Sequence, residues 1–171
     1  MSGDLFDLCD AVVAAIEGWH EIDTRDPGGD TWFGIARAYH PAIPWPPTAD
    51  QAREIRRAEY WLHAGCDRMP FPWCLAVYDC YLNQGGSAIR WAQAALGLKV
   101  DGQLGPATLA TMSAAGSGDR FRAYLSLRIS HYELDREYPS DGDGWRRRVL
   151  RIAQAGEEPL VAQRPSGPEV G

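Results

Sequence analysis

Short apolar segments, many of them opened by a helix-capping residue or proline and closed by glycine or proline, recur along this 171-residue chain. In the first segment Leu5, Leu8, Val12 and Ile16 recur at helical spacing, and Gly18 ends the pattern. Segments of this kind form short helices that each bury one face. The pattern predicts a mainly α protein with about seven helices, the later ones beginning near Thr48, Pro72, Ser87, Pro106, Asp119 and Gly144.

Two of these helices carry specific boundary signals. Thr48 and Gln51 have the spacing of a capping box, and Gly65 ends the helix that follows. Within that helix we expect Ile55, Tyr60 and Leu62 to face inward. The long helix that begins at Asp119 is predicted to continue to Pro139.

The segment between Glu21 and Ile35 breaks the helical pattern. It gathers acidic residues around the Gly28-Gly29 pair, and glycine allows the backbone to reverse tightly. The stretch "TWFGIARAYHP" that follows is short and mixed, which is typical of a strand edge or a single helical turn. We therefore expect a small loop or β-hairpin region after the first helix.

Charge and hydropathy exclude several classes of function. The formal net charge is -6, and no basic run is longer than Arg146–Arg148, so no nucleic-acid partner is expected. Acidic residues precede the first apolar segment, which breaks at Glu17. We therefore expect neither a secretory signal nor stable membrane insertion, and we expect synthesis in the cytoplasm.

The cysteines and histidines do not suggest a metal site. The four cysteines show no CxxC pair, and without an export signal they are expected to stay reduced and buried. His63 and Cys66 do not have the spacing of a structural zinc site. We expect no metal and no cofactor.

The acids after the first helix suggest glycoside chemistry. Glu17 lies on the last helical turn, where the negative end of the helix dipole raises the pKa of a carboxyl group. A reversal at the glycines would bring Asp26 and Thr31 opposite Glu17, which matches the acid and water-positioning groups that glycoside hydrolysis requires. Asp23 and Asp30 are rival candidates for the base. The alternative is a merely solvated acidic loop.

Several motifs resemble one enzyme family, the glycoside hydrolase family 108 muramidases, which are phage and prophage endolysins and related bacterial enzymes. The likeness covers about residues 5 to 154, with several motifs in order. The first motif comprises Glu17-Gly18, Asp26-Pro27-Gly28-Gly29, Thr31 and Gly34-Ile35. The others are "AEYWLHAGCDRMPFP", "AVYDCYLNQG", the peptidoglycan-binding-like "WAQAALGLKVDGQLGPATL" and "GDGWRRRV".

This resemblance implies a lysozyme-like helical fold and a catalytic role for three residues. Glu17 would be the acid that cleaves the β-1,4 bond between N-acetylmuramic acid and N-acetylglucosamine. Asp26 and Thr31 would hold the attacking water, which implies inversion. The family usually has a second glycine where this chain has Trp19. A lytic transglycosylase, a non-catalytic peptidoglycan-binding protein and a secreted antibacterial effector are the alternatives.

Three further residues are candidates for substrate binding. Asp79 and Asn83 lie four apart on one helix face and are suited to an acetamido sugar, with a buried polar pair as the alternative. Trp32 is expected either to stack on a sugar or to join the core. The run Arg146–Arg148 is interpreted as a solvated helix face, with contact to peptide-stem carboxylates as the alternative.

The expected organisation is a catalytic muramidase region in residues 1–85, a helical peptidoglycan-binding-like region in 86–155 packed into the same globule, and a flexible tail in 156–171. We expect a monomer whose partner is the peptidoglycan glycan strand. By resemblance, its role is host lysis by a phage or prophage. Acting on the cell wall in the periplasm would then require a holin or a secretion system.

Overall fold

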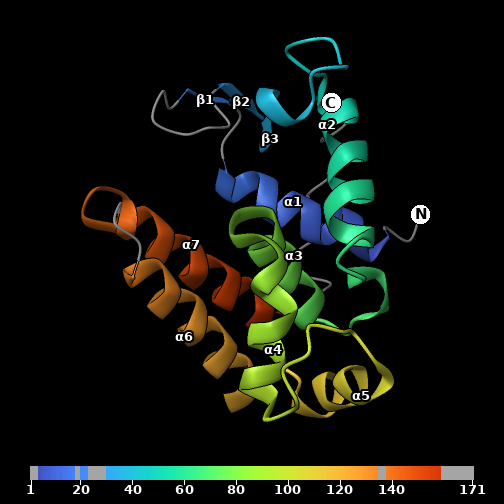
Figure 1. The fold of residues 1–171 in the computed structure, drawn as a ribbon, viewed down its shortest axis with the longest axis vertical. Coiled ribbons are helices and arrows are strands. Elements are labelled where there is room, and N and C mark those ends of the chain that lie inside the picture. Colours follow the sequence, from blue (N-terminus) through green and yellow to red (C-terminus); the bar gives the residue numbers. More distant parts are fainter. Residues whose placement is uncertain (1–3, 18–19, 23–29, 135–137, 159–171) are drawn as a thin grey trace, which may run out of the picture.

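A computed structural model describes residues 4–17, 20–22, 30–134 and 138–158. Within these ranges the side chains of residues 17, 20–22 and 138–141 lie outside the description. The described part is mainly α, as predicted, with one small antiparallel sheet (Figure 1). No helix in it is long and apolar enough to cross a membrane.

The seven α-helices of the described part follow the predicted segments closely. Their bounds are α1 Leu5–Glu17, α2 Ala49–Ile55, α3 Trp73–Gln84, α4 Ala88–Leu96, α5 Pro106–Ala115, α6 Asp119–Glu133 and α7 Tyr138–Glu157. Short 3-10 turns lie at η1 Arg37–Tyr39, η3 Cys66–Arg68 and η4 Gly85–Ser87, and a π-helical segment, η2 Arg56–Leu62, continues α2. The strands are β1 His20–Ile22, β2 Asp30–Trp32 and β3 Ile35–Ala36.

The capping box that begins α2 is confirmed. The Thr48 side chain accepts a hydrogen bond from the Gln51 amide, and the Gln51 side chain accepts one from the Thr48 amide. The predicted inward face was wrong at Leu62, which is 50% exposed, whereas Trp61 is buried. The π-helical turn explains this difference, because its extra residue per turn rotates the face that meets the core.

The boundary between α6 and α7 also differs from the prediction. α6 ends at Glu133 instead of continuing to Pro139, and α7 begins at Tyr138. Proline is compatible with the first turn of a helix, because the amide it lacks has no intrahelical partner there. At its other end α7 runs to Glu157, so the first two residues of the predicted tail are helical. Residues 159–171 lie outside the described part.

The core is built around α3. All residues from Trp73 to Cys80 are buried, so this helix has no solvated face over two turns. It packs against α1, α4, α6 and α7, and in Figure 1 α6 and α7 run side by side next to it. The buried core cluster takes side chains from both predicted regions of the chain, including Phe6, Val13, Leu96 and Tyr124. The four cysteines are free and buried.

The small sheet lies beyond the C-terminal end of α1 (Figure 1). Its order is β1-β2-β3, and both pairs are antiparallel, with Thr31 opposite Glu21 in the register. The turn between β2 and β3 uses left-handed backbone at Phe33 (φ 52°) and Gly34 (φ 75°). The hairpin alternative is thus the one found after the first helix.

A buried ion pair fixes that turn to the core. The Arg56 guanidinium donates to both oxygens of Asp10, at 2.7 and 2.8 Å, and to the carbonyl oxygen of Phe33 at 2.6 Å. The Tyr78 hydroxyl also donates to Asp10, at 2.7 Å. Burial raises the pKa of the Tyr78 phenol, and the Asp10 carboxylate raises it further. The sheet therefore has a defined position relative to α1 and α3.

Candidate active site

The structure places the predicted acid at the end of a helix. Glu17 is the last residue of α1, and β1 begins three residues later at His20. The side chain of Glu17 lies outside the description, as do Asp23 and Asp26. Thr31 is half-buried in the middle of β2, on the strand paired with β1. The catalytic roles of Glu17, Asp26 and Thr31 therefore stay predictions.

Asp30, a rival for the base, has a structural partner. Its carboxylate accepts a hydrogen bond of 2.7 Å from the indole nitrogen of Trp45. This bond connects the start of β2 to the proline-rich segment that follows η1. A carboxylate held in this way already anchors a loop, so Asp30 has a role that does not require catalysis.

Trp32 follows Thr31 at the end of β2. Its side chain is half-buried, and its ring is tilted against that of Phe33 with a centroid separation of 6.1 Å. A half-buried indole keeps part of its surface available for contact with a sugar. Stacking of Trp32 on substrate stays a prediction.

Asp79 does not lie where a sugar could reach it. Its side chain has no exposed area, and its carboxylate accepts hydrogen bonds from Arg128 at 2.6 Å and from two nitrogens of Arg148 at 2.8 and 2.6 Å. A direct sugar contact by Asp79 is therefore wrong. The alternative of a buried polar pair holds only for Asp79, since Asn83 is exposed, and the partners of the buried carboxylate are arginines because a carboxylate inside the core needs cations.

The Asp79 cluster, defined as Asp79, Arg128 and Arg148, joins α3, α6 and α7. Burial alone would lower the pKa of the Arg128 guanidinium, but the adjacent Asp79 carboxylate raises it. The sequence holds a signal for this cluster outside the motifs discussed above. In α6, Arg128 shares helical spacing with the buried Phe121, Tyr124, Leu125 and Tyr132. A charged residue on such an apolar face predicts a buried partner.

Asn83 lies on the surface, one turn beyond Asp79. Its side-chain nitrogen donates to the Asp79 backbone carbonyl at 2.8 Å, and the residue lines a pocket of about 350 Å³. Asp79 and Asn83, which were expected to bind substrate together, therefore have different environments. Asp79 supports the wall from inside, and Asn83 contributes to the wall itself.

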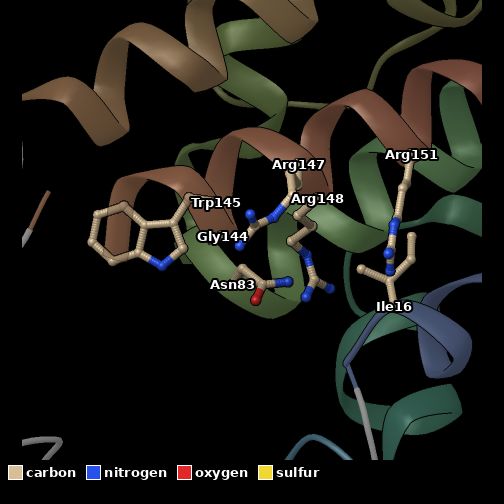
Figure 2. A pocket seen from close by; sticks show the side chains of 7 residues that line it. All are labelled: Ile16, Asn83, Gly144, Trp145, Arg147, Arg148 and Arg151. Atoms are coloured by element: carbon tan, nitrogen blue, oxygen red, sulfur yellow. The ribbon is translucent and has the colours of Figure 1, made fainter. Parts of the chain in front are cut away.

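This pocket, which we call the α7 pocket, lies beside the end of α1. Ile16, the residue that precedes Glu17 in α1, lines the pocket. Most of the other lining residues come from α7 (Figure 2). Trp145 is fixed there by stacking on Tyr132, with ring centroids 4.8 Å apart. The full lining is Ile16, Asn83, Gly144, Trp145, Arg147, Arg148 and Arg151.

The chemistry of the α7 pocket is that of a polar binding site. An amide, an indole ring and guanidinium groups suit a ligand with both sugar and anionic parts. Within the described ranges no three His, Cys, Asp or Glu side chains gather as metal ligands would. Ile16, which lines the pocket, directly precedes Glu17 in α1.

Comparison with known proteins gives a match for two segments of the chain. Residues 11–85 match the model of the glycosyl hydrolase 108 family, and residues 84–112 match that of a peptidoglycan binding domain. Among solved structures, SagA of Brucella abortus is similar with 24% identity and a TM-score of 0.77, over 94% of this chain and 97% of that one. At this identity the likeness concerns the fold. The search of curated proteins gave no match.

The matched ranges contain all but one of the motifs on which the sequence resemblance rests, and "GDGWRRRV" lies beyond them. Glu17, Asp26 and Thr31 all lie within residues 11–85, and the "VDGQLGPATL" segment lies within 84–112. Together the two matches support a glycoside hydrolase that acts on peptidoglycan. The chain thus combines a segment that matches the glycosyl hydrolase 108 family, residues 11–85, with one that matches a peptidoglycan binding domain, residues 84–112.

Proposed function

We propose that this protein is an N-acetylmuramidase that hydrolyses the β-1,4 bond between N-acetylmuramic acid and N-acetylglucosamine in peptidoglycan. The observation that carries the proposal is the family match over residues 11–85, which includes a glutamate at the very end of α1. The α7 pocket beside that helix end supports it, because Ile16 lines the pocket and directly precedes Glu17.

Glu17 is the general acid in this proposal. At the C-terminal end of α1 it meets the negative end of the helix dipole, which favours the protonated carboxyl group. The carboxyl donates its proton to the glycosidic oxygen as the bond to the anomeric carbon breaks and an oxocarbenium-like centre forms. The leaving sugar departs as an alcohol.

Asp26 and Thr31 hold the water that completes the reaction. β1 begins three residues after Glu17 and pairs with β2, so the chain returns toward the helix end with Thr31 on the returning strand. Water attacks the face opposite the leaving group and gives up a proton to Asp26, which inverts the anomeric carbon. This geometry requires the Glu17 and Asp26 carboxyl groups to lie about 6.5 to 9.5 Å apart.

The biological role proposed is host lysis by a phage or prophage, in which the enzyme reaches the periplasmic wall through a holin-type pore or a secretion apparatus. It rests on the resemblance to endolysins. Expression of the gene during infection, with and without a holin, and a count of lysed cells would test it. Lysis that requires no such route would contradict the proposed access.

Product analysis by mass spectrometry tests the reaction. Purified peptidoglycan treated with the wild type should gain reducing muramic-acid ends, and Glu17→Gln should release none because a carboxamide is too weak an acid to protonate the glycosidic oxygen. Glu133→Gln is the matched control, since Glu133 is also the last residue of its helix, α6, and is exposed. It should keep full activity.

Each other outcome identifies an alternative. Anhydro-muramic ends would indicate a lytic transglycosylase, and equal products from wild type and Glu17→Gln would move the acid elsewhere. Binding to the sacculus without cleavage by the wild type would indicate a peptidoglycan-binding protein. NMR of the first-formed anomer tests inversion separately, because a retained configuration would require a covalent intermediate.

A further inference from the structure

The α7 pocket concentrates positive charge in an acidic protein. Arg147, Arg148 and Arg151 all line it, although the formal net charge of the chain is -6. None of its described lining side chains is acidic. Guanidinium groups gathered in a concave surface attract anionic ligands and orient carboxylates through paired N–H donors.

Arg148 serves a different purpose from the other two arginines. It is buried, and both its Nε and Nη2 donate to Asp79 from within the Asp79 cluster. Arg147 and Arg151 are exposed. In the part of the chain that the structure describes, neither of these two has an ion-pair partner. Anion binding in the pocket therefore falls to Arg147 and Arg151.

The spacing of Arg147 and Arg151 suits a charged group on an extended substrate. They are four residues apart in α7, so they lie on the same helix face about one turn apart. In Figure 2 Arg147 lies near Asn83 and Trp145, and Arg151 lies beside Ile16. The two arginines thus extend along the pocket from Asn83 and Trp145 to Ile16 near the end of α1.

The proposed substrate carries matching anions. In peptidoglycan the lactyl group of N-acetylmuramic acid bears a peptide stem with free carboxylates, whereas the sugar backbone is uncharged. If a muramic-acid sugar of the glycan chain contacts Asn83 and Trp145, its peptide stem would lie against Arg147 and Arg151 of α7. A carboxylate offers two oxygens to each guanidinium fork, which makes it the preferred partner.

We propose that Arg147 and Arg151 bind a carboxylate of the peptide stem and make the enzyme selective for stem-bearing peptidoglycan. This inference rests on the proposed function, since it takes peptidoglycan as the substrate. It assigns stem recognition to α7, which lies outside both ranges matched by the family models.

The test compares two forms of one substrate. Soluble peptidoglycan chains are used as isolated or after carbodiimide-driven amidation, which neutralises the stem carboxylates and keeps the stems. The wild type should show a KM about ten-fold higher on the amidated chains, equivalent to about 1.4 kcal/mol. The double variant Arg147→Gln/Arg151→Gln should have the higher KM on both forms, with kcat nearly unchanged.

Two companion variants separate charge from structure. Arg68→Gln/Arg122→Gln removes the same number of positive charges from exposed sites outside the pocket, and it should behave as the wild type. Arg147→Lys/Arg151→Lys keeps the positive charges but loses the paired N–H donors of the guanidinium groups. It should recover only part of the affinity that the double Gln variant loses. Thermal unfolding of all variants should match the wild type, because the substituted side chains are exposed.

A binding measurement keeps this inference separate from the hydrolase proposal. Sedimentation with insoluble sacculi, in the Glu17→Gln background, needs no cleavage and should show the same dependence on amidation and on the Arg147/Arg151 pair. If amidation changes neither KM nor sedimentation, or if the two double Gln variants behave alike, stem recognition by these arginines is wrong. If the wild type cleaves nothing but sedimentation depends on the pair, the hydrolase proposal alone fails.

Discussion

Asp10 and Asp79 are both buried carboxylates held by arginine, but they support different walls of the candidate site. Asp10 pairs with Arg56, and that guanidinium also binds the Phe33 carbonyl in the turn that follows Thr31. Asp79 lies between Arg128 and Arg148, and Arg148 lines the α7 pocket. One ion pair thus positions the strand with the predicted water-binding residue, and the other positions the pocket.

The difference shows how one kind of interaction can have two functional consequences. Neither ion pair stabilises the fold much relative to an apolar replacement, because the cost of desolvating buried charges offsets their attraction. Breaking either one by removing a single partner is costly. The comparison therefore predicts large losses of stability from single substitutions and different effects on kcat and KM.

The largest effect is expected for Asp79→Asn. It leaves two fully or nearly buried guanidinium groups, those of Arg128 and Arg148, without their carboxylate. The free energy of unfolding should fall by about 3–5 kcal/mol, measured by urea denaturation. Asp143→Asn, at an exposed position early in α7, is the control and should change little. A loss below about 1 kcal/mol would mean that the two cations find other partners.

Asp10→Asn should destabilise less. Only one cation, Arg56, loses its counter-ion, and it keeps its hydrogen bond to the Phe33 carbonyl. We expect the free energy of unfolding to fall by about 2–3 kcal/mol in the same urea experiment. A loss equal to or larger than that of Asp79→Asn would contradict the ranking and would show that the sheet end contributes more stability than the α6–α7 end.

Arg56→Lys distinguishes the two walls by kinetics. Lysine keeps a charge near Asp10, but its single nitrogen does not reproduce the fork that also binds Phe33. Under the proposed function kcat should fall about ten-fold with little change in KM, because the strand with Thr31 is repositioned. Steady-state kinetics on soluble peptidoglycan would measure this. A change in KM alone would indicate that the turn contributes to binding instead.

The smallest effect is expected at a half-buried carboxylate on the surface. Asp101 accepts hydrogen bonds from the Gln103 amide and the Gln93 side chain, and the Gln103 bond is the main cause that holds its pKa below the ordinary 3.8. A lowered folded-state pKa stabilises the protein above pH 3.8, and this contribution is lost as the pH falls through the lower value.

Asp101→Asn should therefore remove a small, pH-dependent part of the stability. Urea denaturation of the variant and the wild type should differ most near neutral pH and converge in acid. A difference that is constant from neutral pH to strong acid would mean that the turn depends on the shape of Asp101 and not on its charge.

Many helix boundaries of this fold were predictable from the residues that cap or break helices. Thr48 with Gln51, Pro106 and Gly18 each signalled a helix end that the structure confirms, because caps and breakers act on the local backbone. The wider turn at Arg56–Leu62 was not predictable in this way. It moves Trp61 into the core and Leu62 out, and only tertiary packing selects it.

The candidate site was predictable in part. Family motifs pointed to Glu17, Asp26 and Thr31, and the structure confirms that α1 ends at Glu17. The helical spacing of Asp79 and Asn83 did not reveal which of them faces inward, since burial depends on α6 and α7, which come later in the chain. Asn83 and the stem-contact alternative for Arg146–Arg148 pointed to parts of the α7 pocket, but the pocket itself was not predictable, because its lining comes from three helices far apart in the chain.

Arg147 and Arg148 are neighbours in sequence, yet a helix turns by about 100° per residue, so one side chain is exposed and the other is buried. For protein engineering this separates substrate preference from stability, two properties that substitutions usually change together. Under the proposed stem recognition, a library of substitutions at positions 147 and 151 should vary substrate preference at little cost in stability, whereas position 148 should stay arginine. The outer face of α7 is thus the place to redesign this enzyme.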